Sequence, residues 1–300
     1  MRLSSSQIYQ QAVNAMLSKQ AELAKTQLQL ATGKRVLAPS DDPAAATQVI
    51  NLNQAIETTA QYQRNSDYAE TRLSIEETVL ADVGNVLQRV RELSVRANND
   101  TLSAGDRQAI ADEVRTNLDA VFQLANNQDS SGEYLFSGYK TGTVPFTDDG
   151  SGNYTYQGDQ GTRSLQVGAN RQVSIGDAGN DVFMKVDDGA GGTINMFEML
   201  NDIITSLEAN NPTPTALTQL DSALDVVLST RSTIGARMNT IDAQRNANDS
   251  FSLVLQENRS KLEDLDYAEA VSKFEQQILA LQASQQSFVK IQGLSLFNYL

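Results

Sequence analysis

The side chains that could carry chemistry in this chain are few. The segment from Ser137 to Gly142, Ser-Gly-Tyr-Lys-Thr-Gly, contains the patterns S-x-x-K and K-T-G. Penicillin-binding enzymes use both patterns, but on different elements and with two different lysines. Here Lys140 would have to serve both patterns, and the serine lies in a strand-like segment instead of at a helix start. The segment therefore favours an exposed hairpin lysine over a catalytic one.

Aspartates could suggest a calcium site, because calcium prefers clustered oxygen ligands. None of them follows the D-x-D-x-D-G spacing of a calcium loop, and Asp-Gly pairs are also typical of tight turns. The aspartates concerned are Asp148, Asp149, Asp159, Asp177 and Asp181. The chain has no Cys and no His, which removes thiolates, disulfides, imidazole bases and the usual zinc ligands. We expect no catalytic, cofactor-binding or metal-binding residue, and a protein that is not an enzyme.

The charge of the chain is unevenly distributed. The net charge of its 300 residues is −14, whereas residues 1–45 carry a net +2 and residues 255–300 a net −2. The whole negative charge therefore belongs to residues 46–254, which suggests ends that pack against protein and a middle that faces water. An acidic surface repels phosphate, which argues against nucleic acid. No apolar run approaches the ~18 residues of a membrane span, so no membrane is expected either.

Glycine marks a β-rich insert. Thirteen of the 18 glycines fall between Gly132 and Gly192. Within this window, short segments alternate between apolar and polar residues, separated by Gly, Asp and Asn turns, as in antiparallel strands. These segments are residues 134–136, 153–156, 164–167 and 172–175. We predict a small antiparallel β domain between helical regions.

Outside this window the apolar residues follow helical spacing. Two seams of the coiled-coil kind lie near the two ends, each with apolar residues at five of seven positions. They are Tyr9, Val13, Met16, Gln20, Leu23, Gln27 and Leu30, and Val271, Phe274, Ile278, Leu281, Gln285, Phe288 and Gln292. Further stripes, expected to be core faces, contain Val79, Val83, Val86, Val90 and Leu93, and Ile110, Val114, Asn117, Val121 and Leu124.

Turn and cap residues predict where the helices end. Gly33 follows the first seam, at the position where a left-handed residue closes a helix. Asp42 and Pro43 supply a cap and a first-turn proline for a second helix. Ser103 and Asp106 form a capping-box pattern that opens a third helix. Prolines at 212 and 214 separate a helix near 194–209 from a longer one that begins near Thr215.

Three motifs carry a family resemblance. Residues 28–46, LQLATGKRVLAPSDDPAAA, resemble the N-terminal region of the flagellin superfamily, in which a heptad helix ends at glycine and an S-x-D-D segment opens the next helix. Residues 231–237, RSTIGAR, and 260–268, SKLEDLDYA, are similar to its C-terminal motifs. Together the resemblance covers roughly residues 1–125 and 215–300.

Further segments are closer to one branch of that superfamily. The start MRLSSSQIY, the segment GEYLFSG at 132–138 and the ending GLSLFNYL at 293–300 are similar to the hook–filament junction proteins, the hook-associated protein 3 family. Flagellin itself, with different end sequences, is the main alternative. An enzyme-bearing flagellin-like protein and a generic coiled-coil scaffold are weaker ones, and the first of these would need a metalloprotease motif that a chain without His lacks.

The resemblance implies a fold of mainly α class with a β insert: coiled-coil-like terminal helices, a helical middle bundle and a small antiparallel β outer domain. The domains expected are 1–42 with 258–300, 43–138 with 193–257, and 139–192. The implied role is a subunit of the bacterial flagellum that self-associates in a ring between hook-associated junction protein 1 and flagellin. The resemblance also implies type III export without a cleaved signal peptide, an export chaperone beforehand, and an extracellular location at the hook–filament junction.

The terminal seams lead to a further expectation. Each contains two glutamines, and a polar residue in a coiled-coil seam costs stability while it specifies register. We therefore expect residues near 1–40 and 262–300 to be mobile in the isolated chain and to become ordered helices on assembly. The residues predicted to carry the assembly interface are Leu23, Leu30, Ile278, Leu281 and Phe288.

Overall fold

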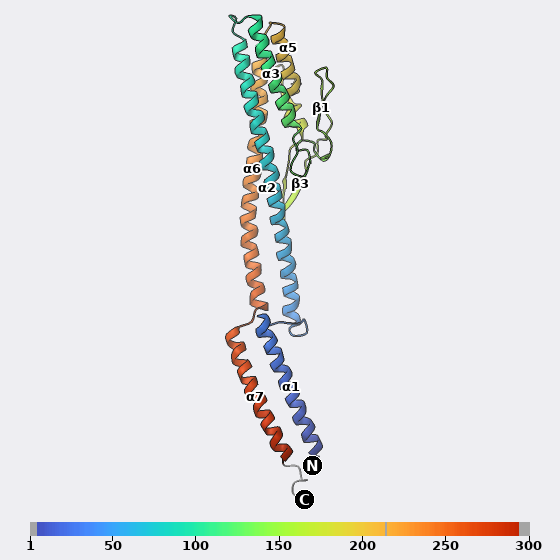
Figure 1. Ribbon diagram of the computed structural model, residues 1–300, viewed down its shortest axis with the longest axis vertical. Helices are drawn as coiled ribbons and strands as arrows, with labels where there is room; N and C mark the ends of the chain where they lie inside the picture. Colours follow the sequence, from blue (N-terminus) through green and yellow to red (C-terminus); the bar gives the residue numbers. More distant parts are fainter. Residues whose placement is uncertain (1–4, 214, 294–300) are drawn as a thin grey trace. The chain divides into compact units, whose positions relative to one another are not determined.

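A computed structural model describes residues 5–213 and 215–293. These residues form seven helices and six short strands (Figure 1). In chain order the elements are α1 (Ser5–Thr32), α2 (Pro43–Ala97), α3 (Ala104–Ala125), β1 (Phe146–Asp148), β2 (Tyr154–Tyr156), β3 (Ser164–Gly168), β4 (Arg171–Ser174), α4 (Gly179–Phe183), β5 (Val186–Asp187), β6 (Thr193–Ile194), α5 (Met196–Glu208), α6 (Thr215–Glu263) and α7 (Tyr267–Gly293). The predicted fold class, mainly α with a β insert, is confirmed.

The chain divides into two compact units. The smaller one, which we call the terminal unit, comprises residues 1–58 and 250–300, and the larger one, the bundle unit, comprises residues 59–249. Both boundaries fall inside a helix, the first in α2 and the second in α6, so that these two helices contribute to both units. The predicted division into three domains, with a separate β domain at 139–192, stays a prediction.

The bundle unit has a continuous hydrophobic core, and α3 packs against α5 within it. The predicted stripes of α2 and α3 face this core: Val83 and Val90 on α2 and Val114 on α3 are fully buried, as is Val227 of α6. Burying a side chain of this size stabilises the folded state by about 1.5–3 kcal/mol. The stripes were therefore correctly predicted as core faces.

The helix ends follow the predicted signals. Ser103 accepts a hydrogen bond from the Asp106 N–H, while the Asp106 carboxylate accepts one from the Ser103 N–H at 3.1 Å, which completes the capping box. The Asp42 carboxylate accepts the Ala45 N–H at 3.0 Å at the start of α2. Gly33 has φ +69°, the left-handed conformation that closes α1. All three predictions are confirmed. They could be made from the sequence because hydrogen bonding and backbone conformation within a few residues decide where these helices begin and end.

The β region consists of three separate two-stranded antiparallel sheets, β1–β2, β3–β4 and β5–β6. Three of the four predicted alternating segments lie in strands, but the prediction for residues 134–136 is wrong. Tyr134 makes only an isolated bridge to Gln128. Leu135 and Phe136 are both buried, next to each other in sequence, whereas a strand at a sheet surface would bury only one of the two.

Aromatic rings connect the β region to the helices. Phe146 of β1 contacts Phe183 of α4 and Phe197 of α5, with ring centroids 5.3 and 5.1 Å away, and the latter two rings also stack on each other at 5.9 Å. Phe122 of α3 meets Phe197 at 5.7 Å in an edge-to-face arrangement. Such pairs add roughly 0.5–1.5 kcal/mol each beyond their buried area. The β region therefore completes the core of the helical bundle.

A buried network of charges makes a second connection. Arg72 of α2 donates to Asp129 at 2.6 Å, and Arg237 of α6 makes a bidentate pair with Asp177, both distances being 2.8 Å. Between them, the Glu76 carboxylate accepts the Asp177 N–H at 3.0 Å. Glu76 is only 1% exposed, and this burial, with the nearby Asp177 charge, raises its pKa to about 8. Glu76 is therefore mainly protonated at neutral pH.

This pKa makes the stability of the bundle unit pH-dependent. Because the folded-state pKa lies above the ordinary value of 4.5, the contribution of Glu76 is complete below pH 4.5 and is lost as the pH rises through about 8. We expect the free energy of unfolding to fall with a slope of up to about 1.4 kcal/mol per pH unit from this group. Glu76→Gln, which cannot ionise, should flatten that slope in urea unfolding measured from pH 5 to pH 9.

The neighbouring Glu77→Gln is the matched control. Glu77 is partly exposed and pairs with Arg231 at 2.6 Å, so its loss should lower stability without removing the fall in unfolding free energy between pH 5 and pH 8. A Glu76→Gln protein whose free energy of unfolding falls with pH as steeply as that of the unsubstituted chain would contradict the prediction.

Candidate assembly interface

The terminal unit is built on a pair of antiparallel helices, α1 and α7, which pack side by side (Figure 1). At one end of the pair, the rings of Tyr9 and Phe288 lie 5.1 Å apart. At the other end, Lys34 and Asp264 form an antiparallel bridge just beyond the two helices. The predicted pairing of the two chain ends is therefore observed for the described residues, while the motif residues at 1–4 and 294–300 lie outside them.

The five predicted interface residues lie along this pair. Leu23 and Leu30 on α1 and Ile278, Leu281 and Phe288 on α7 are all partly buried. Phe288 contacts Tyr9 across the pair. The part of all five residues in contacts between subunits stays a prediction.

The phase predicted for the seams is wrong at their polar positions. Gln20, Gln27 and Gln285 are exposed, and the side chain of Gln292 lies outside the described residues. The buried polar residues of the pair are instead Thr26 and Gln277. Thr26 fits because it is small and its hydroxyl donates to the Glu22 carbonyl at 3.1 Å within its own helix. Thr26 comes one residue before the predicted position Gln27, and Gln277 comes one residue before the predicted position Ile278.

Gln277 is the one buried polar residue of the α1–α7 pair whose side chain is incompletely bonded among the described residues. It is 9% exposed, and its Oε1 has no hydrogen-bond partner. A buried unsatisfied group of this kind costs about 1–3 kcal/mol. The pair is therefore less stable than its leucines alone would make it.

Two distant sequence motifs meet where the pair ends. The Arg35 N–H donates to the Glu263 carbonyl at 2.7 Å, and the Leu265 N–H donates to the Gly33 carbonyl at 2.9 Å. The Lys34 ammonium pairs with Glu263 at 2.5 Å. Residues 33–35 and 263–265 thus form a short two-stranded crossing, which we call the motif crossing. The motif crossing was not predicted from the sequence, although each motif contains the end of one helix and, within ten residues, the start of the next.

Carboxylates order the chain on both sides of the motif crossing. Asp266 accepts the N–H groups of Ala268 and Glu269, at 2.9 and 3.2 Å, and so caps α7. Asp41 accepts the N–H groups of Leu37 and Ala38, both at 3.2 Å. It also pairs with Lys25 of α1 at 2.6 Å, and these contacts, the Lys25 hydrogen bond first, lower the pKa of Asp41. The carboxylates here are used as caps and turn acceptors.

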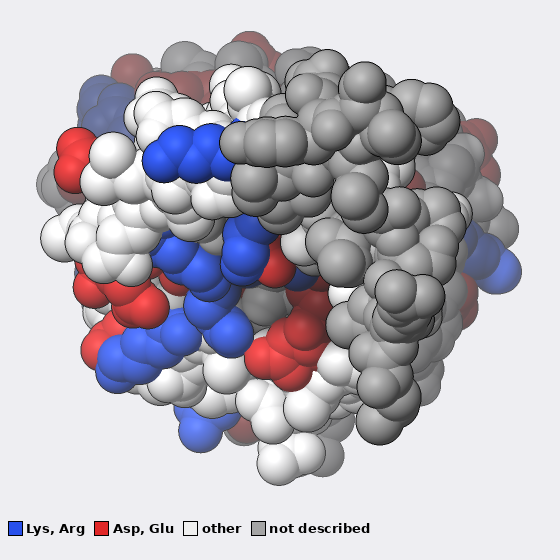
Figure 2. All heavy atoms as spheres, turned by 90° about the horizontal axis from the view of Figure 1, so that it is seen from below, with Lys and Arg blue, Asp and Glu red and all other residues white. Residues whose placement is uncertain are grey.

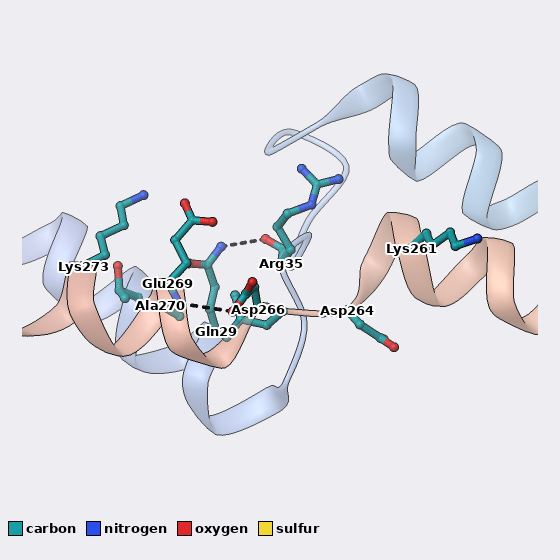
Figure 3. Close-up of a pocket in the computed structure, with 10 residues that line it drawn as sticks. Gln29, Arg35, Lys261, Asp264, Asp266, Glu269, Ala270 and Lys273 are labelled. Atoms are coloured by element: carbon teal, nitrogen blue, oxygen red, sulfur yellow. Dashed lines mark hydrogen bonds between the residues drawn. The ribbon is translucent and has the colours of Figure 1, made fainter.

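A cavity of about 380 Å³ lies beside the motif crossing (Figure 3). Gln29 donates to the Arg35 carbonyl within it at 2.6 Å, and Lys261 and Lys273 come from the helices on either side. The charged lining residues are Arg35, Lys261, Lys273, Asp264, Asp266 and Glu269. Basic and acidic groups are equal in number, so the cavity has no preference for an anion or a cation. Among residues 5–213 and 215–293, no group of three or more acidic side chains is placed to hold a metal ion.

The terminal unit exposes apolar side chains to an unusual degree. It has eleven of the sixteen exposed large hydrophobic side chains of the described residues, although it is the smaller unit. Its formal charge is −1, against −13 for residues 59–249. In Figure 2, basic side chains gather near the centre of the view, with acidic side chains on either side of them. Exposed large apolar side chains are thus concentrated in the terminal unit.

This arrangement of paired terminal helices, a helical bundle and a small β region is that of flagellin-like structural proteins. Residues 3–141 match the bacterial flagellin N-terminal helical region and residues 217–300 match its C-terminal helical region. The chain is 35% identical to flagellar hook-associated protein 3 of Escherichia coli, over 99% of both chains. It is 27% identical to the flagellin of Bacillus subtilis, over 91% of this chain and 90% of that one.

A solved structure has the same fold. The flagellar hook-associated protein 3 of Legionella pneumophila superimposes with a TM-score of 0.68, covering 71% of this chain and 98% of that one at 23% identity. The chain belongs to the flagellar hook-associated protein 3 family within the flagellin superfamily, a family of structural flagellar components. None of the helices in the described part of the chain is long and apolar enough to span a membrane.

Gly33 supplies a test of the motif crossing. A Cβ atom at this position would lie 2.9 Å from the Tyr267 hydroxyl oxygen, and the left-handed φ adds about 1–2 kcal/mol of strain for any L side chain. We expect Gly33→Ala to speed hydrogen exchange at the Arg35 and Leu265 amides. Gly33→Ala combined with Tyr267→Phe should recover part of the protection, because only the backbone strain remains.

Gly132→Ala is the matched control for this experiment. Gly132 has φ +78°, but a Cβ there would meet nothing within 4 Å. The Gly132→Ala variant should therefore have backbone strain without a steric clash, and hydrogen exchange at its Arg35 and Leu265 amides should be unchanged. Unchanged protection of those two amides in Gly33→Ala would mean that the motif crossing does not depend on the glycine.

Proposed function

We propose that this protein is a structural subunit of the bacterial flagellum that joins the hook to the filament. The observation that carries the proposal is the full-length similarity to flagellar hook-associated protein 3, combined with the exposed apolar surface of the terminal unit. The subunits form a short ring through their terminal helices. One side of the ring contacts hook-associated junction protein 1 and the other contacts the first flagellin subunits.

The charge distribution supports assembly through the terminal helices. Like-charged bodies repel when they approach, and the charge of −13 on residues 59–249 disfavours close packing of one bundle unit on another. The terminal unit, with its charge of −1, lets identical subunits approach closely. We infer that the terminal unit makes the assembly contacts and that the bundle unit faces water in the assembled flagellum.

The remaining elements of the proposal concern transport and chemistry. The chain leaves the cell by type III export, is held by an export chaperone beforehand, and acts outside the cell. It has no catalytic activity and no cofactor. Its three-part domain division, with a terminal assembly domain, a bundle domain and the β-rich segment 139–192 outermost, belongs to the same proposal.

Flagellin is the second candidate function. The 27% identity to Bacillus subtilis flagellin over most of both chains supports it, but the 35% identity to hook-associated protein 3 favours the junction. A bacterium that lacks the chain distinguishes the two. Loss of a junction subunit should leave hooks without filaments and flagellin shed into the medium, whereas loss of flagellin should leave no flagellin to shed.

Antibody labelling of flagella by electron microscopy tests the location directly. We expect label confined to the hook–filament boundary when the chain is restored to that bacterium. Label along the whole filament would instead identify a flagellin, and absence of the chain from purified flagella would contradict both candidates.

We also infer that the α1–α7 pair is marginal in the isolated chain and is stabilised by assembly. The buried Gln277 with its unpaired Oε1 lowers the stability of the pair. In dilute solution the amides of α1 and α7 should therefore exchange faster than those of residues 79–124, and they should become protected in flagella. Equal protection in both regions of the isolated chain would contradict this inference.

Substitution of Gln277 makes this test sharper. Gln277→Leu replaces an unsatisfied amide with an apolar side chain of similar size, so α7 amides should exchange several-fold more slowly in the isolated chain. Gln285→Leu, two turns further along the same helix and exposed, is the control and should change little. An unchanged rate in Gln277→Leu would show that the buried amide does not limit the stability of the pair.

A further inference from the structure

A small cavity lies among the charges that attach the β region to α2. Its volume is about 10 Å³, close to the smallest space that holds one water molecule. Arg72 of α2 lines it, together with Leu135 and with Gly176, which directly precedes Asp177 of the Arg237–Asp177 pair. The cavity therefore lies where three segments of the bundle unit meet: α2, the chain before β1, and the chain between β4 and α4.

Polar atoms surround the space beside Gly176. A Cβ atom at this position would lie 3.8 Å from Glu76 Oε2, 3.8 Å from the Leu135 carbonyl oxygen and 3.9 Å from Arg72 Nε. All three of these residues are buried. The distances are those of ordinary contacts, so an atom fits here without a steric clash, but its three nearest neighbours are all hydrogen-bonding atoms. A polar occupant of this space would therefore find partners, whereas an apolar one would leave them without any.

The side chain of Arg72 has one nitrogen directed to this space. Its Nη1 donates to Asp129 at 2.6 Å, and its Nη2 donates to the Tyr134 carbonyl at 3.2 Å. The nitrogen nearest to Gly176 is Nε, which carries a single N–H. The occupant must therefore accept a hydrogen bond from Arg72 and donate one to the Leu135 carbonyl.

The charges around the cavity favour a neutral occupant. A cation would meet the guanidinium groups of Arg72 and Arg163, and an anion would meet the carboxylate of Asp177 and the carbonyl oxygen of Leu135. Glu76 adds little charge, because its raised pKa keeps it mainly protonated at neutral pH. Water is neutral, both donates and accepts, and has the size of the cavity.

We propose that this cavity binds one ordered water molecule, which accepts a hydrogen bond from Arg72 Nε, donates one to the Leu135 carbonyl oxygen and makes a third with Glu76 Oε2. A water that bridges protein groups in this way is nearly as favourable as direct hydrogen bonds between them. It joins α2 to the two segments that carry Leu135 and Gly176. Glycine is required at 176 because a side chain would occupy the space of the water.

A crystal structure of the full chain, at a resolution that shows ordered water, tests the site directly. We expect one peak within hydrogen-bonding distance of Arg72 Nε and the Leu135 carbonyl oxygen, and no such peak in Gly176→Ala. Crystals grown in sodium bromide are the control for an anion, because bromide gives an anomalous signal. A bromide signal at the site, a cavity without a peak, or a peak that persists in Gly176→Ala would overturn the proposal.

Urea unfolding of two Gly176 variants gives an independent readout. An alanine methyl group fits the space but displaces the water without replacing its hydrogen bonds, so Gly176→Ala should raise the equilibrium constant of unfolding about tenfold. A serine hydroxyl both donates and accepts, so Gly176→Ser should recover most of this loss although serine is larger than alanine. A purely steric effect would give the opposite order of stability.

Gly142→Ala is the matched control. Gly142 is exposed, its backbone lies outside the left-handed region like that of Gly176, and a Cβ there would meet nothing within 4 Å. This variant should be as stable as the unsubstituted chain or slightly more stable, because alanine restricts the unfolded chain. A Gly176→Ala protein as stable as this control, or a Gly176→Ser protein less stable than Gly176→Ala, would overturn the proposal.

Discussion

The terminal unit depends on the main-chain hydrogen bonds between residues 33–35 and 263–265. Within ten residues of this motif crossing, α1 ends, α2 begins, α6 ends and α7 begins. Backbone groups at helix ends must find partners outside their own helix, and here each strand of the crossing supplies partners for the other. The contact joins segments about 230 residues apart, so that neither α1 nor α7 is positioned by its own sequence alone.

The bundle unit solves a different problem, because its β region is too small to bury a core of its own. Phe146 and Phe183 complete the helical core, and the pairs Arg72–Asp129 and Arg237–Asp177 attach the same region to α2 and α6. A buried ion pair contributes little net stability, but removing one partner is costly. The network therefore specifies where the β region lies more than it adds to the free energy of folding.

The sequence predicted those features that local interactions decide. The left-handed Gly33 and the Ser103–Asp106 capping box follow from residues within one turn of each other, and both predictions are correct. The placement of Gln20 and Gln27 in the buried seam was wrong. Which of two adjacent residues faces inward depends on how the partner helix packs, and the sequence of one helix alone does not show this. Nothing in the sequence indicated that Glu76 is buried, because a glutamate within a long helix is usually exposed. Its burial and its hydrogen bond from the Asp177 N–H come from contacts with residues about 100 positions later in the chain.

For the candidate interface, the residues predicted from the sequence lie on α1 and α7, and the structure shows which faces of these two helices are exposed. Leucines at heptad spacing can pack against a helix of the same chain or of another, and sequence periodicity does not distinguish the two cases. Leu23 and Leu30 are partly buried, whereas Leu17 and Leu28 of the same helix are exposed. The periodicity of α1 therefore predicts an apolar helix but does not show which of its faces a partner helix covers.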